Sequence, residues 1–230
     1  RNSTTPSPNV GGVSILPELA VNPAASIKIY RNIISNEDIA IRYKHTGPIN
    51  MEVYENRIYG SNYGFYLRGG TNYIHDNYIY NIALAAFDFT NSAMTTTLQH
   101  NTVYKSPLFI ATDFEGTAAV NVIRIKDNIY YSESNPDGAV HLGRWSNQAF
   151  NLSLVSGSNN MYSYVGTIFM YSQGVGYSFS GAMAKLSDTT SVIDAPIFTN
   201  VGNVDLCLTS DSPGVNQASD GTNIGSKCLQ

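Results

Sequence analysis

Residues 64–81 read GFYLRGGTNYIHDNYIYN and contain the pattern from which the fold can be predicted. It contains an apolar alternation that ends in Arg68, then a double glycine, a second alternation and Asn77. Alternating apolar residues are typical of half-buried β-strands, and paired glycines are typical of turns. One short segment therefore carries more than one strand, which is expected where a chain winds in small coils.

The second alternation recurs along the chain. It appears as IKIYRNII (27–34), MEVYENRIY (51–59), NYIHDNYIY (72–80), TTLQHNTVY (96–104) and IRIKDNIYY (123–131). Each copy follows one template, in which an apolar alternation is followed by an Asn and then by another apolar residue. The Asn positions are 32, 56, 77, 101 and 128, and SNNMY predicts Asn159 as the sixth. A template that repeats in this way indicates stacked structural repeats.

Each repeat predicts three strands. The apolar residues on either side of the Asn fall on one face of two short strands that meet there. A third strand completes the coil, at 39–44, 64–68, 86–90, 110–113 and 139–143, with 12–16 and 166–171 extending the series. The sequence therefore predicts an all-β fold, a single-stranded parallel β-helix with three parallel sheets, about seven coils and an Asn ladder at one turn. A β-sandwich would not repeat one Asn template, and a propeller blade needs about 40 residues.

The composition limits the classes of partner. Of 230 residues, 43% are hydrophobic and 13% charged, and the net charge is −4, so no global field would attract nucleic acid. There is no run of 18 apolar residues to span a membrane. Residues 1–12 are expected to be an extension, 13–171 the coils and 172–230 a closing segment. Because the polar start cannot cap a first coil, an N-terminal domain or another chain is expected to supply missing coils.

Both cysteines lie near the end of the chain. Cys207 and Cys228 are expected to pair as a disulfide in the closing segment, and the alternative is two unrelated buried thiols. A disulfide favours a secreted or cell-surface protein.

The third strands carry unusual outward residues. With Ile41 and Tyr43 inward, alternation gives two outward rows: Arg42, Tyr66, Asp88 and His141 in one, and Lys44, Arg68, Thr90 and Asp113 in the other, with Arg144 just beyond. Two cations on neighbouring coils repel by about 3 kcal/mol at a dielectric near 20, before solvent screening. The pair predicts an anionic partner or a lysine used as a general base. The alternative is a pair of solvated surface residues neutralised by Asp88 or Glu37.

The chain resembles the right-handed parallel β-helix, or pectate-lyase-like, superfamily. The ending IDAPIFTNVGNVDLCLTSDSPGVNQASDGTNIGS and the turn SNNMYSY resemble the closing segments of bacterial members. Lys44, followed 24 residues later by Leu67-Arg68-Gly69-Gly70, is similar to the Lys and L-R-H-G pair of the alginate lyase and chondroitinase B group. Here Tyr43-Lys44-His45 replaces the usual N-K-S, and Gly69 replaces the usual His.

The resemblance implies a polysaccharide lyase that acts on acidic polysaccharide by β-elimination. It implies Lys44 as the base and Arg68 as the group that stabilises the developing charge. The outward residues that would contact the sugar are Arg42, Tyr66, Asp88, His141 and Arg144. Calcium could neutralise the uronate, with Asp88, Asp113 and Glu115 as oxygen ligands.

Two other functions fit the same residues. A glycoside hydrolase would use Asp88 and Asp113 as paired carboxylates on the same groove. A non-catalytic protein, such as a glycan-binding module, an adhesin or a spike segment, would need an aromatic surface and no proton-transfer group. The Tyr after most Asn positions (Tyr59, Tyr80, Tyr104 and Tyr131) recurs with the template, which favours a structural role for it.

Overall fold

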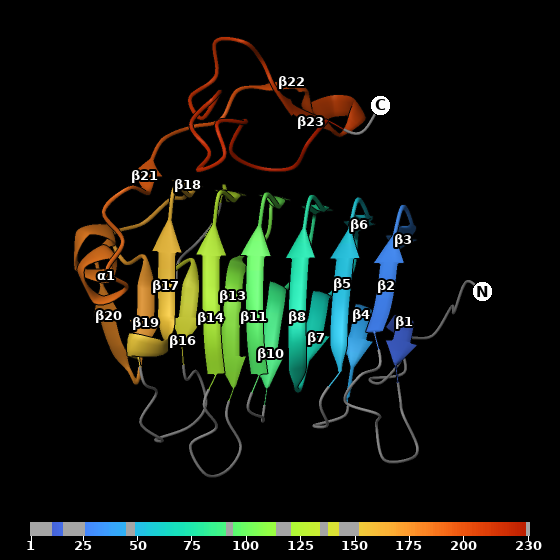
Figure 1. Cartoon of the computed structure of the whole chain (residues 1–230). Helices are drawn as coiled ribbons and strands as arrows, with labels where there is room; N and C mark the ends of the chain where they lie inside the picture. The colour runs from blue at the N-terminus through green and yellow to red at the C-terminus, as the bar shows by residue number, and fades with distance from the viewer. Residues whose placement is uncertain are drawn as a thin grey trace.

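The chain forms a parallel β-helix (Figure 1). The computed structural model describes residues 11–15, 26–44, 49–90, 94–113, 121–133, 138–142 and 152–228. Each coil contributes one strand to each of three sheets, which we call sheets A, B and C. Within these residues no helix is long and apolar enough to cross a membrane.

The strands of each sheet come from successive coils. Sheet A contains β1 (Gly11–Ile15), β4 (Ile39–Tyr43), β7 (Tyr63–Leu67), β10 (Ala85–Thr90), β13 (Leu108–Asp113), β16 (Val140–Leu142), β19 (Met170–Ser172) and β20 (Val175–Tyr177). Sheet B contains β2 (Ser26–Tyr30), β5 (Asn50–Tyr54), β8 (Gly70–His75), β11 (Met94–Gln99), β14 (Asn121–Lys126) and β17 (Val155–Ser158). Sheet C contains β3 (Ile33–Ser35), β6 (Arg57–Tyr59), β9 (Tyr78–Tyr80), β12 (Thr102–Tyr104), β15 (Ile129–Tyr131), β18 (Met161–Ser163) and β21 (Val192–Ile193). Neighbouring strands are parallel, apart from the antiparallel pair β19–β20.

The stretch 64–81 contains most of one coil. It holds nearly all of β7, the whole of β8 and the whole of β9. The double glycine is the turn between sheets A and B, where Gly70 has a φ of +83° and a Cβ would lie 2.7 Å from the carbonyl oxygen of Ile49. In the described residues six coils have a strand in all three sheets, fewer than the seven or so predicted.

The Asn ladder is present at the turn between sheets B and C. The side-chain oxygen of each Asn accepts hydrogen bonds from the backbone and side-chain nitrogens of the preceding Asn, for example 3.1 and 2.9 Å from Asn56 to Asn77. The sixth member is Asn160 and not Asn159, since Asn160 Oδ1 accepts from Asn128 at 3.0 Å. Asn159 has a φ of +50° and occupies the left-handed position that precedes every ladder Asn. The other residues in that position are Arg31, Glu55, Asp76, His100 and Asp127.

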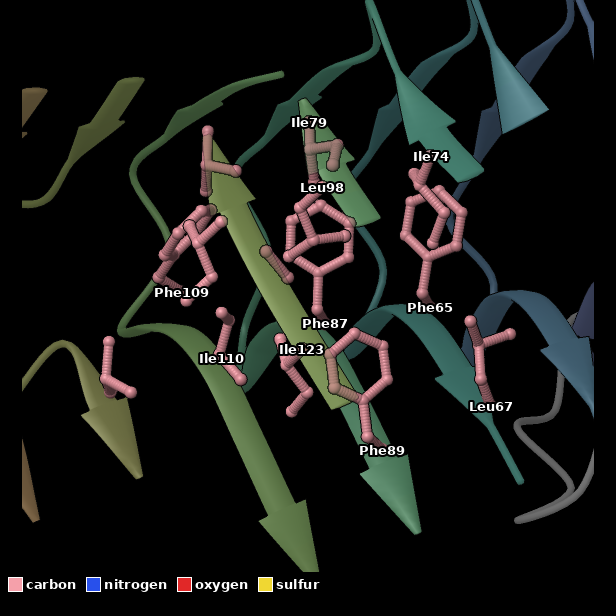
Figure 2. Close-up of a cluster of buried hydrophobic side chains, with 14 of the residues drawn as sticks. Phe65, Leu67, Ile74, Ile79, Phe87, Phe89, Leu98, Phe109, Ile110 and Ile123 are labelled. Carbon is pink, nitrogen blue, oxygen red and sulfur yellow. The ribbon is translucent and has the colours of Figure 1, made fainter. Parts of the chain in front are cut away.

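The interior is filled by the apolar residues that flank the ladder and by the inward faces of sheet A. Figure 2 shows Phe65, Phe87 and Phe89 pointing into the helix toward side chains of the other two sheets. Phe65 and Phe87 stack with ring centroids 5.1 Å apart because they are paired in the register of β7 and β10. In-register stacking therefore gives each coil the same core positions as the coil before it.

A short helix closes the C-terminal end of the core. The Ser- and Gly-rich segment 172–191, at the start of the predicted closing segment, contains α1 (Phe179–Lys185), which begins after the capping residue Ser178. Ala182, Met183 and Leu186 of this region are buried in the main core. The helix therefore covers apolar residues that the last coil would expose to water.

After β21 the chain returns along the side of sheet C. We call residues 196–228 the C-terminal strap, which includes the antiparallel pair β22 (Phe198–Asn200) and β23 (Asp205–Leu208) (Figure 1). The fully buried carboxylate of Asp127 accepts hydrogen bonds from the backbone nitrogen and the hydroxyl of Ser219, both at 2.7 Å. His100 Nε2 lies 3.2 Å from Asp220 Oδ2. His100 and Asp127, two of the residues with left-handed backbone that precede a ladder Asn, therefore bind the strap to the coils.

The strap covers the tyrosine row of sheet C. Tyr80 and Tyr104 are buried with Leu206 of the strap, and Tyr59 and Tyr131 pack against the same cluster. Tyr59 stacks on Tyr80 at 4.8 Å, and Tyr104 stacks on Tyr131 at 5.0 Å. This packing gives the recurrent tyrosines a structural role.

The predicted disulfide between Cys207 and Cys228 is present and closes a loop within the strap. Replacing both cysteines by Ser is expected to lower the free energy of unfolding by about 3 kcal/mol, because the unfolded chain regains the entropy of an open loop of this length. Urea unfolding of the variant and of the oxidised protein measures the difference. Adding a reductant to the unmodified protein should reproduce it, and no shift in either experiment would contradict the prediction.

Two carboxylates at the contact between the strap and the coils predict that the protein loses stability in acid. Hydrogen bonds from Thr222 hold the pKa of Asp220 at about 2. Burial opposes ionisation of Asp76, but the hydrogen bond from His75 and the charge of Lys227 leave its pKa below the ordinary value. Because both pKa values are lower in the folded state, their stabilisation is present above the unfolded value, near 4, and is lost as the pH falls through the folded values.

We therefore expect the urea midpoint to fall between about pH 4 and pH 2. The decline should be smaller in Asp220→Asn, which has no carboxylate at this position to protonate. An identical decline in the variant and the parent protein would show that Asp220 contributes nothing to it.

Candidate functional site

Sheet A places the two predicted rows of outward residues on neighbouring strands. Arg42 of β4 is paired with Tyr66 of β7, and Tyr66 is paired with Asp88 of β10. Asp88 is paired with Ala111 of β13, so a small apolar residue separates it from His141 of β16. In the second row Thr90 is paired with Asp113, while Lys44 and Arg68 directly follow the paired residues Tyr43 and Leu67. The parallel register therefore brings together residues from coils that are far apart in the sequence.

Exposure varies within both rows, since Tyr66 is partly exposed in the first and Thr90 is only 5% exposed in the second. Arg42, Asp88 and His141 are only 6%, 4% and 8% exposed, although alternation points them away from the core. Lys44, one residue past the end of β4, is exposed, and Arg68 is partly buried. Lys44 is therefore an exposed cation beside polar groups that are largely buried.

Tyr66 lies between the two arginines. The guanidinium carbons of Arg42 and Arg68 lie 5.9 and 5.7 Å from its ring centroid, within the range of cation–π contacts. Arg68 Nη2 also donates a hydrogen bond to the Tyr66 hydroxyl at 3.3 Å. These contacts fix the orientation of both guanidinium groups.

Lys44 and Arg68 are not neutralised by Asp88 or Glu37. None of the ion pairs in the described part of the chain includes either cation. The backbone nitrogen of Arg68 donates to the carbonyl of Tyr43 at 3.0 Å, which continues the β4–β7 ladder to the level of these two residues. The pair is therefore a local concentration of positive charge, as an anion-binding surface requires.

The predicted acidic residues Asp88, Asp113 and Glu115 are not brought together as a group by the described structure. Asp88 and Asp113 lie on adjacent strands and two positions apart in register, so their Cα atoms are about 8 Å apart by strand geometry. Glu115 and Arg144 lie outside the described residues. No group of three metal-ligating side chains occurs among the described residues, so the calcium site stays a prediction.

The structure adds two aromatic residues that the sequence analysis did not single out. Tyr63 packs edge-on against Tyr66, with centroids 6.3 Å apart, and Tyr171 packs edge-on against His141 at 5.3 Å. Tyr171 is the partner of His141 in the register of β16 and β19, so extending the first row by one coil would have identified it. Tyr63 begins β7 and has no distinguishing signal in the sequence.

A separate pocket of about 380 Å³ lies where the strap meets sheet C. Its lining includes Arg57, Tyr78, Asp205 and both cysteines of the disulfide. Tyr78 donates its hydroxyl proton to the carbonyl of Lys227 at 3.0 Å, so this tyrosine serves to hold the strap.

Comparison with known proteins identifies the fold alone. The family model described as the right handed beta helix region matches residues 2–149. Neither the curated proteins nor the solved structures contain a match to this chain. The activity must therefore be inferred from the side chains on sheet A.

Proposed function

The chain belongs to the right-handed β-helix family, and we propose that it is a polysaccharide lyase that cleaves a uronic-acid-containing polysaccharide by β-elimination. The observation that carries the proposal is the pair of cations Lys44 and Arg68 on sheet A, which no ion pair of the described residues neutralises. Arg42 and Asp88 lie in the neighbouring row of the same face and are both buried. A polymer with one carboxylate on each sugar complements such a surface.

The reaction assigns a role to each cation. Lys44 Nζ removes the proton from the carbon α to the uronate carboxylate, and its exposed position at the end of β4 gives the side chain the freedom to reach it. The electron pair forms a carbon–carbon double bond as the bond to the β oxygen breaks, and the leaving oxygen takes a proton from solvent. Arg68 stabilises the negative charge that develops on the carboxylate, as a fixed guanidinium does best.

Two other features support this proposal. The Cys207–Cys228 disulfide fits a protein that works outside the reducing cytosol, where acidic polysaccharides occur. Tyr66, which is partly exposed, and His141 lie on the same row as Arg42, and side chains of this kind bind sugars through stacking and hydrogen bonds. We propose that these residues and Asp88 contact the polymer.

The test is to incubate the protein with alginate, pectate and glycosaminoglycans. Elimination creates an unsaturated uronate, which is followed by its ultraviolet absorbance, while hydrolysis creates reducing ends without that absorbance. An increase in absorbance on one polymer supports the lyase. Reducing ends alone would instead favour a hydrolase using Asp88 and Asp113, which lie on adjacent strands of sheet A. No product from any polymer would favour a binding or structural protein.

A further inference from the structure

Two polar atoms next to each other on sheet A lack a partner. Arg68 Nε and Thr90 Oγ1 are both buried, and neither forms a hydrogen bond within the described structure. Thr90 is only 5% exposed. Because Leu67 is paired with Phe89, the residues that follow them, Arg68 and Thr90, are neighbours on adjacent strands and point to the same outward side.

An unsatisfied buried polar group is destabilising, and most folded proteins avoid it. Here the two groups are a guanidinium N–H and a hydroxyl, and each can donate a hydrogen bond. They come from adjacent strands, which are about 4.8 Å apart. Arg68 donates from Nη2 to the Tyr66 hydroxyl at 3.3 Å, while its Nε–H has no partner in the described structure. Two neighbouring donors beside a positive charge match an anion with two oxygens.

We propose that Arg68 Nε and Thr90 Oγ1 form a two-donor subsite for one carboxylate of a bound uronate chain, which makes Thr90 a specificity-determining residue. This inference rests on the proposed function and names how the site holds the acidic sugar. Lys44 lies on the other side of Arg68 from Thr90, one residue past the end of the adjacent strand β4. Lys44 and the subsite are therefore both at the C-terminal ends of neighbouring strands of sheet A.

The test measures binding without turnover. Isothermal titration uses the full chain carrying Lys44→Ala, with oligogalacturonate and oligoalginate of defined length and the methyl-esterified oligogalacturonate as neutral ligand. Adding Thr90→Val is expected to weaken binding of the free acids by roughly tenfold, which is the value of one hydrogen bond to a charged group. Thr90→Ser keeps the hydroxyl and should bind nearly as well as its parent. The neutral ester should show no difference between the three proteins.

Thermal unfolding provides the second readout. Valine has the shape of threonine and removes the unsatisfied hydroxyl, so Thr90→Val should unfold at the same or a slightly higher temperature while binding less well. A lower unfolding temperature would show that the hydroxyl serves the fold, and this would overturn the subsite.

The outcomes separate the two proposals. Equal binding of the free acid by Thr90→Val and its parent would overturn the subsite and leave the proposed function intact. Preference for a sulfated neutral polymer over both oligouronates would overturn the uronate assignment. Failure of every oligouronate to bind any of the proteins would overturn the proposed function together with the subsite.

Discussion

Replacing Lys44 by Ala is expected to lower the rate of unsaturated product formation by about a thousandfold, because a positioned general base typically contributes between 10² and 10⁴. The side chain is exposed and forms no ion pair among the described residues, so its removal should leave the fold unchanged. Initial rates from ultraviolet absorbance, with the polymer that the unmodified protein cleaves, measure the effect.

A matched control separates the chemistry from the loss of one positive charge. Lys28 lies on β2 of sheet B, is exposed like Lys44, and pairs with Glu52 at 2.7 Å. Lys28→Ala changes the net charge by the same amount and should leave the rate within about twofold, since an exposed ion pair on another sheet contributes little. Lys44→Arg keeps the charge but is a poor base, and it should be almost as inactive as Lys44→Ala. Equal rates for Lys44→Ala and Lys28→Ala would exclude Lys44 as the base.

The fold was predictable because its determinants are local and repeated. For the ladder residues from Asn32 to Asn128, the apolar residue three positions before the Asn, such as Ile74, and the one two positions after it, such as Ile79, are buried in the core. A parallel stack without register shifts places equivalent template positions at the same point of successive coils. For the same reason the outward rows of sheet A could be assigned from alternation alone.

Features that interrupt the repeat could not be predicted. Two adjacent asparagines, Asn159 and Asn160, fit the template almost equally, and only the left-handed backbone of the first shows which one joins the ladder. The helix α1 spans only 7 residues, too few for a helical period to be visible among Ser and Gly. The path of the strap depends on contacts such as Asp127 with Ser219, which are 92 residues apart.

The candidate site was predictable in position but not in environment. The sequence placed Arg42 on the outward face and gave no sign that it is 6% exposed or that its guanidinium lies near Tyr66. Nothing in the sequence indicated that Arg68 Nε and Thr90 Oγ1 would be buried without hydrogen-bond partners. Burial and hydrogen bonding on an outer face depend on three-dimensional surroundings that strand alternation does not encode.

The largest loss of stability is expected for Asn77→Ala, in the middle of the ladder. The fully buried Asn77 amide nitrogen donates hydrogen bonds to the carbonyl of Val53 at 2.9 Å and to Asn101 Oδ1 at 3.0 Å. Its oxygen accepts hydrogen bonds from the backbone and side-chain nitrogens of Asn56. Alanine leaves these buried partners unsatisfied, and each costs about 1–3 kcal/mol. We expect the free energy of unfolding to fall by about 4 kcal/mol, measured by urea denaturation.

Asn32→Ala is the control because it removes the same side chain from the exposed end of the ladder. Asn32 donates from its side chain to Asn56 Oδ1 at 3.0 Å and to the carbonyl of Tyr30. Asn56 is buried, but Asn32 itself is exposed, so water can enter the space that its side chain leaves. Its removal should cost less than about 1 kcal/mol, since only a buried group left without a partner carries the full desolvation penalty. Similar losses for the two variants would mean that the ladder stabilises the fold through the asparagine conformation at each turn. A large difference would assign the stability to the continuous chain of buried amides that joins one coil to the next.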